Sequence, residues 1–182
     1  LNPDQRVIQL LEQIKDKLKL PKLPMHIECF DNSNIQGSDA VAACVVFKKA
    51  KPVKSEYRKF NIKTVVGPDD YASMREVVKR RYERLIAENA PLPDLIVADG
   101  GVGQMEVIRQ VIENELNKSI PIIGLAKDNK HKTREILVGF PAQSVGIKPT
   151  DQIFKFLSNL QDEVHRFAIS FHRDKRSKAQ TK

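Results

Sequence analysis

Apolar residues recur along this chain with two spacings, and the change of spacing marks the expected elements. Short apolar runs bounded by turn-forming residues predict strands, whereas apolar positions three and four apart predict amphipathic helices. The expected strands cover residues 25–30, 40–47, 57–65, 95–99, 120–126 and 133–140. The expected helices cover residues 4–18, about 70–89, 102–116 and 153–171. The close succession of the first three strands favours an antiparallel meander.

The order of these elements predicts an α/β fold. After the helix at residues 4–18, three strands are followed by a helix, a strand, a helix and a strand, which gives a mixed sheet flanked by helices. This order matches the ribonuclease H-like architecture, although other α/β folds share it. We expect an N-terminal helix and linker over residues 1–22, one ribonuclease H-like domain over residues 23–172, and a basic tail over residues 173–182.

Composition narrows the class of protein. A chain of 182 residues suffices for one hydrophobic core. No apolar run approaches the roughly 20 residues that span a bilayer, and no signal peptide is visible, so we expect no membrane association. Cys29 and Cys44 both lie in apolar stretches, which favours reduced thiols in a cytoplasmic protein.

The positive charge is clustered. The net charge is +8, and residues 48–63 hold seven Lys and Arg against Glu56 alone. Residues 173–182 hold five basic residues against Asp174. Such clusters suit a polyanionic partner such as nucleic acid. A solvated hairpin followed by a disordered end explains them equally well.

The segment at 95–104 carries the first chemical signal. An apolar strand ends at Asp99, and Gly100, Gly101 and Gly103 follow before a helical pattern begins. Neither a Walker loop nor a dinucleotide fingerprint fits this spacing. Asp31 also ends an apolar strand, so the two carboxylates meet if those strands are neighbours. A divalent cation such as Mg²⁺ or Mn²⁺ would then relieve their repulsion. The alternative is two acids that each cap a separate turn.

Other polar residues are candidates for the same site. His165 lies at the border of the apolar face of the last expected helix, close to Arg166. Lys127 follows an expected strand and could contact a phosphate. Asp69 and Asp70 precede a helix, where capping accounts for at least one of them. A lone helical histidine and a strand-end lysine are also common without any such role.

Four segments, in order, resemble motifs of the C-terminal nuclease domain of the UvrC family of bacterial nucleotide excision repair. They are residues 27–37 (IECFDNSNIQG), 69–74 (DDYASM), 99–104 (DGGVGQ) and 162–168 (DEVHRFA). The resemblance extends from about Pro21 to Lys178. It implies a ribonuclease H-like fold and a divalent-metal-dependent endonuclease that cuts DNA on the 5′ side of a lesion.

The resemblance also implies roles for individual residues. Asp31, Asp99 and His165 would be the ligands of Mg²⁺ or Mn²⁺, and Asp70 would be a further acid of the catalytic region. UvrB would be the partner that receives the damage from UvrA, through parts of the longer protein outside this chain. We expect contacts with the DNA backbone from Lys48, Lys49, Lys127, Arg166, Arg173, Lys175 and Arg176.

Two positions depart from the family pattern. Many relatives have lysine in place of Val102 and histidine in place of Asn34. Two alternatives to a lesion-directed nuclease remain open, and Val102 supports the first of them. One is a catalytically silent module that binds DNA or protein, and the other is a nuclease for RNA–DNA hybrids or branched DNA.

Overall fold

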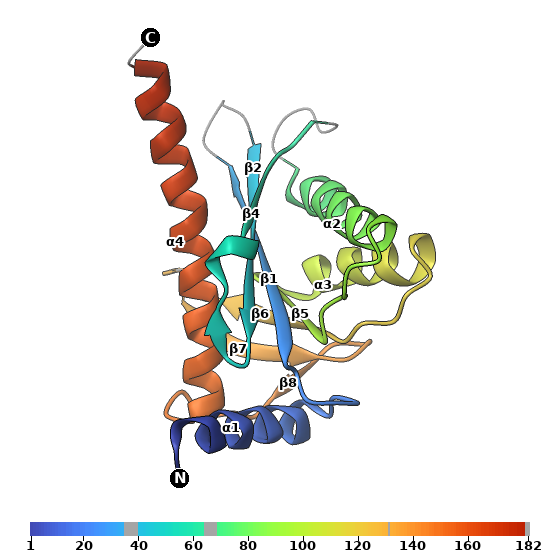
Figure 1. Cartoon of the computed structure of the whole chain (residues 1–182), viewed down its shortest axis with the longest axis vertical. Coiled ribbons are helices and arrows are strands. Elements are labelled where there is room, and N and C mark those ends of the chain that lie inside the picture. Colours follow the sequence, from blue (N-terminus) through green and yellow to red (C-terminus); the bar gives the residue numbers. More distant parts are fainter. Residues whose placement is uncertain (35–39, 64–68, 131, 181–182) are drawn as a thin grey trace.

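A computed structural model of the chain describes residues 1–34, 40–63, 69–130 and 132–180, with the backbone alone at residues 32–34, 40 and 171–180 (Figure 1). It confirms the expected α/β class, with one mixed eight-stranded sheet between two layers of helices. The strands are β1 (His26–Asn34), β2 (Ala40–Lys48), β3 (Lys51–Pro52), β4 (Arg58–Asn61), β5 (Leu95–Ala98), β6 (Ile122–Lys127), β7 (Thr133–Val138) and β8 (Gln143–Val145). The α-helices are α1 (Pro3–Leu18), α2 (Asp70–Ala87), α3 (Val102–Arg109) and α4 (Gln152–Gln180). Two short helical turns complete the list, η1 (Lys54–Glu56) and the π-helical η2 (Gln110–Glu115), which continues α3.

The sheet has the order β3-β2-β1-β5-β6-β7-β8, with β4 also paired to β2. β1 and β5 are parallel, as are β5 and β6, and every other pair is antiparallel. Parallel neighbours end at the same edge of a sheet, where open α/β folds place their ligands. The carboxyl ends of β1 and β5 therefore form the centre of that edge.

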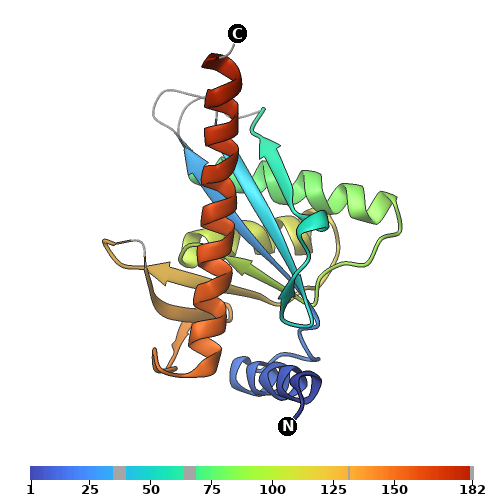
Figure 2. The ribbon, with the colours of Figure 1, turned by 60° about the vertical axis from the view of Figure 1, so that its left-hand side comes forward.

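Alternation along the strands divides the core into two halves. Ile27, Cys29, Leu95 and Val97 belong to the half covered by α1 and α4. Phe30, Ile96 and Ala98 belong to the half covered by α2 and α3. Figures 1 and 2 both show α4 along one face of the sheet, with α2 and α3 on the other. Because side chains alternate, the next residue after Cys29 or Val97 to face α4 is an aspartate in each strand.

Several elements differ from those expected. β1 continues to Asn34, so Asp31 lies within the strand and not at its end. The expected strand at residues 57–65 is observed as β4 over Arg58–Asn61, which begins after η1, and residues 64 and 65 lie outside the described residues. The ring of Tyr57 packs on α4, 5.0 Å from the ring of Phe167. The three-residue strand β8 was not expected, since its Gln-Ser-Val sequence has no apolar alternation. α4 continues through residues 173–180, where a separate basic tail was expected. Its last turns extend beyond the sheet (Figure 2).

None of the helices in the described ranges is both long enough and apolar enough to cross a bilayer.

Candidate active site

Asp31, within β1, and Asp99, directly after β5, lie side by side. Phe30 and Ala98 are partners in the parallel pairing of β1 and β5, and the amide of Asp99 donates to the carbonyl of Phe30 at 3.0 Å. Asp31 and Asp99 are therefore the next residues in register on neighbouring strands, which lie about 4.8 Å apart. Both residues are buried, with exposed fractions of 4% and 7%. The structure therefore places the two aspartates next to each other, as expected if their strands are neighbours.

Each aspartate has a partner on α4. The Nδ1 atom of His165 lies 3.5 Å from Oδ2 of Asp31, and half of the His165 side chain is exposed. One helical turn earlier, Nε2 of Gln161 donates to Oδ1 of Asp99 at 2.8 Å. Residues four apart share a face of a helix, so one orientation of α4 serves both contacts.

A cation already sits on the second oxygen of Asp99. The ammonium group of Lys127, at the end of β6, lies 2.7 Å from Oδ2 of Asp99. β6 pairs with β5 in parallel, so Lys127 reaches the same edge of the sheet as the two aspartates. Lys127 was expected to contact a phosphate, and in the structure its partner is the carboxylate of Asp99.

The local charges change the protonation of both acid and base. Burial and the neighbouring Asp31 raise the pKa of Asp99 to about 7, although Lys127 and Gln161 act in the opposite direction. The hydrogen bond with Asp31 raises the pKa of His165. Both shifts have one cause in common, since two carboxylates in a confined space repel each other and attract protons or cations.

A cavity of about 740 Å³ opens beside Asp99. It is lined by Asp69, Asp70, Tyr71, Asp99, Gly100, Gly101, Val102, Gly103, Gln104 and Lys127. Asp31 and His165 are not among its lining residues. The cavity therefore joins the start of α2 to the glycine loop, and Asp99 connects it with the α4 side of the sheet.

Two glycines allow the close approach of these segments. A Cβ at Gly103 would lie 2.3 Å from the hydroxyl of Tyr71, so a side chain here would require the exposed Tyr71 ring to move. A Cβ at Gly124 in β6 would lie 2.9 Å from the carbonyl oxygen of Gly100. By contrast, nothing lies within 4 Å of a Cβ at Gly101, so packing there does not require a glycine. The glycine loop therefore packs closely against Tyr71 of α2 and Gly124 of β6, whereas Gly101 faces open space.

The acids at the start of α2 have separate positions. The side chain of Asp69 caps the helix by accepting from the amide of Ala72 at 3.0 Å, as expected for one of the pair. Asp70 begins the helix and is exposed at the wall of the cavity. Asp70 therefore shares the cavity with Asp99, in agreement with its placement in the catalytic region.

The other predicted DNA contacts are dispersed. Arg166 follows His165 on α4, is 58% exposed, and pairs with Glu163. Lys48 lies opposite His26 in the β1–β2 register, at the other end of β1 from Asp31, and pairs with Glu56. Lys49 is the next residue and shares that remote end. The side chains of Arg173, Lys175, Arg176 and Asn34 lie outside the described residues.

The predicted ligands are neighbours without forming a closed coordination shell. In the described part of the chain, no three Cys, His, Asp or Glu side chains lie together as a group that could hold a metal ion. Instead, Lys127 neutralises Asp99 and His165 contacts Asp31. Sequence reasoning missed Gln161, although its spacing of four residues from His165 was visible.

A comparison with protein families shows the family of the chain. Residues 2–169 match the family model described as the UvrC RNase H endonuclease domain. The chain belongs to this family. It is 71% identical over 180 residues to UvrABC system protein C of Bacteroides thetaiotaomicron, a match that covers 99% of the chain and 30% of that protein. The same protein of Bacteroides fragilis is 69% identical, with 99% and 29% covered.

The chain therefore spans about 30% of the length of these UvrC relatives. Solved structures with a similar chain fold include endonuclease V of Ciona intestinalis, in complex with an inosine-containing 24mer DNA. This protein is 16% identical to the chain, with a TM-score of 0.44, and the match covers 69% of this chain and 59% of that one. Human endonuclease V is 15% identical with a TM-score of 0.44, and 68% and 59% of the two chains are covered.

Proposed function

We propose that this chain is the domain that makes the 5′ incision beside a lesion during nucleotide excision repair, in a reaction that depends on Mg²⁺ or Mn²⁺. The observation that carries the proposal is the pair of buried aspartates in register on β1 and β5, with a cation already on one of them. Membership of the UvrC endonuclease family supports the reaction class.

The residues present fit a divalent cation in their chemistry. Asp31 and Asp99 offer hard oxygen ligands, and His165 offers an imidazole nitrogen. The ammonium of Lys127 on Asp99 shows that a positive charge is favourable at this point. A bound divalent cation would favour deprotonation of an attacking water and neutralise charge on the leaving 3′-oxygen. Asp31, Asp99 and His165 would hold it.

The surrounding residues would position the DNA backbone. The cavity at Asp99 is open beside Gly101, where no side chain obstructs a phosphate. Lys127 can exchange its carboxylate partner for a phosphate oxygen, and the exposed Arg166 lies on the same helix as His165. These contacts read no sequence, so damage selection would fall to partners such as UvrB and UvrA. Such a repair enzyme would act in the cytoplasm.

Plasmid nicking tests the proposal. The chain is assayed with Mn²⁺ as wild type, Asp31→Ala and Asp99→Ala, with Asp16→Ala on the exposed face of α1 as the matched control. We expect nicking by the wild type and the control, and background levels from both site variants. Undiminished nicking by either site variant would contradict the assignment of the site.

The choice of substrate separates the alternatives. Lesion-bearing duplex, RNA–DNA hybrid and a four-way junction are compared in the same assay with the longer protein that contains this chain, with and without UvrA and UvrB. Preference for the lesion duplex in the presence of these partners supports the proposal. Binding to DNA with no cleavage of any substrate would favour the silent binding module instead.

A further inference from the structure

Among the side chains of α4 that the structure describes, Gln161 is the buried polar one that contacts the aspartate pair. It is 3% exposed, and both ends of its amide have partners. Nε2 donates to Oδ1 of Asp99 at 2.8 Å, and Oε1 accepts a hydrogen bond from the hydroxyl of Thr133. The three side chains form a chain of hydrogen bonds that connects β7, α4 and the end of β5.

The carboxylate of Asp99 sets the orientation of the amide. An ionised carboxylate only accepts hydrogen bonds, so the NH₂ group of Gln161 faces Asp99. A hydroxyl can either donate or accept, so Thr133 does not select this orientation. It holds the other end of the amide in place by donating to Oε1.

The same hairpin supplies the other partner of Asp99. Lys127 and Thr133 are paired across β6 and β7, where the register shifts between Ala126 and Lys127. This irregularity places the ammonium of Lys127 on one oxygen of Asp99 while Thr133 supports the donor to the other. A bulge that re-aims side chains beside a site is a common device.

The two oxygens of Asp99 therefore differ in kind. Oδ1 is held by a buried, neutral and doubly bonded amide. Oδ2 is held by a long, partly exposed cation that can leave. We propose that Gln161, anchored by Thr133, is a positioning residue that keeps Oδ1 occupied and so presents Oδ2 of Asp99 to the divalent cation. This inference rests on the proposed function, because it assigns the way in which that same site is preorganised.

The affinity for Mn²⁺, measured by the loss of the free-ion electron paramagnetic resonance signal, tests the inference without any cleavage step. The variants are Gln161→Leu, Thr133→Val and Thr133→Ser, with Gln152→Leu at the exposed start of α4 as the matched control. We expect Gln161→Leu to weaken binding about tenfold, as partners of metal ligands commonly do. Thr133→Val should weaken it by a smaller factor of about three, because the amide persists but loses the hydrogen bond that holds its Oε1 end in place. Thr133→Ser and Gln152→Leu should bind like the wild type.

Thermal unfolding of each variant shows that the fold is retained. If Gln161→Leu does not fold, the contrast between Thr133→Val and Thr133→Ser decides, since only the former removes the hydroxyl. Equal affinities across the folded site variants would overturn the role of Gln161 and leave the proposed function intact. No Mn²⁺ binding by the wild type would overturn both.

Discussion

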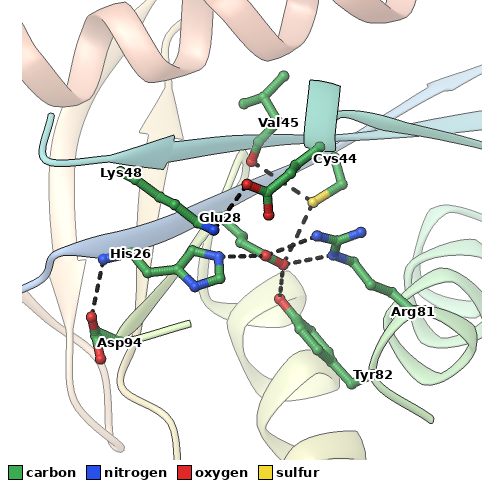
Figure 3. A network of polar contacts seen from close by, with 9 residues as sticks. His26, Glu28, Cys44, Val45, Lys48, Arg81, Tyr82 and Asp94 are labelled. Carbon is green, nitrogen blue, oxygen red and sulfur yellow. Dashed lines mark hydrogen bonds and ion pairs between the residues drawn. The ribbon is translucent and has the colours of Figure 1, made fainter. Parts of the chain in front are cut away.

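Two buried carboxylate sites lie three residues apart on β1, on opposite faces of the sheet, and they differ in whether the protein itself neutralises them. Glu28 faces α2, and its oxygens accept from Arg81 at 2.6 and 2.8 Å and from the hydroxyl of Tyr82 at 2.7 Å (Figure 3). His26 adds a contact at 2.8 Å. Asp31 faces α4, where it shares one lysine and one exposed histidine with Asp99.

The protonation of the two sites shows the consequence. Burial opposes ionisation of Glu28, but Arg81, His26 and Tyr82 together lower its pKa to about 2. The pKa of Asp99 is instead raised to about 7 by burial and by Asp31. Arg81 neutralises Glu28 and so holds α2 on the sheet. The raised pKa of Asp99 shows that the charges of the two aspartates are less well balanced. An unbalanced buried charge beside a cavity is typical of a functional site.

The largest expected effect is the loss of stability when the Glu28 site is broken. Arg81→Met leaves Glu28 as a buried charge without its cation, which should cost about 3–5 kcal/mol of unfolding free energy. Urea denaturation measures this loss. The control Arg84→Met removes a 77% exposed arginine on the same helix and should cost under about 1 kcal/mol. A loss of similar size in the two variants would contradict the comparison.

Acid should weaken the Glu28 site next. The pKa of Glu28 falls from its ordinary value of 4.5 to about 2 on folding, so its contribution is complete above pH 4.5 and is lost as the pH drops towards 2. The shift corresponds to about 3 kcal/mol. Urea denaturation between pH 2 and 6 should show this dependence in the wild type and less of it in Glu28→Gln. An identical pH dependence in both proteins would refute the assignment to Glu28.

The aspartate site should respond in the opposite direction. Asp99→Asn removes one of two neighbouring charges, so without metal it should be neutral or stabilising by about 1 kcal/mol at pH 7. Because the folded pKa of Asp99 is raised, its proton is bound more tightly in the folded chain, and the wild type should lose stability as the pH rises from about 4 to 7.

Unfolding in the presence of a chelator at pH 5 and pH 8 provides the measurement. The advantage of Asp99→Asn should grow with pH, while its Mn²⁺-dependent nicking falls to background. A variant that is much less stable than the wild type at pH 8 would show that Asp99 serves the fold.

The smallest stability effect is expected at the mouth of the cavity. Val102 is 54% exposed at the start of α3, so Val102→Lys should change the unfolding free energy by no more than about 1 kcal/mol, the size of a charge effect at a helix end. The added lysine should strengthen DNA binding and increase its dependence on salt by about one phosphate contact. Binding measured over a series of salt concentrations checks this. An unchanged salt dependence would show that DNA does not approach this end of α3.

The sequence predicted the fold class and the neighbourhood of the two aspartates because both depend on local alternation and strand order. Asp31 and Asp99 each continue an apolar strand, and parallel strands end at one edge. The partners of these acids were harder to foresee. Arg81 lies 53 residues from Glu28, and Thr133 lies 28 residues from Gln161, so only the packed elements bring them together. The contact of Tyr57 with Phe167 of α4, just before β4 begins at Arg58, likewise depends on the packed elements.

The central claim is that the aspartate site, unlike the Glu28 site, is completed by a divalent cation. The most direct test is a crystal structure of the chain soaked in Mn²⁺, with anomalous scattering to locate the ion. We predict an anomalous peak about 2–2.5 Å from carboxylate oxygens of both Asp31 and Asp99, with the ammonium of Lys127 displaced from Asp99. Absence of a peak at a saturating Mn²⁺ concentration, with the ammonium of Lys127 still 2.7 Å from Oδ2 of Asp99, would contradict the account.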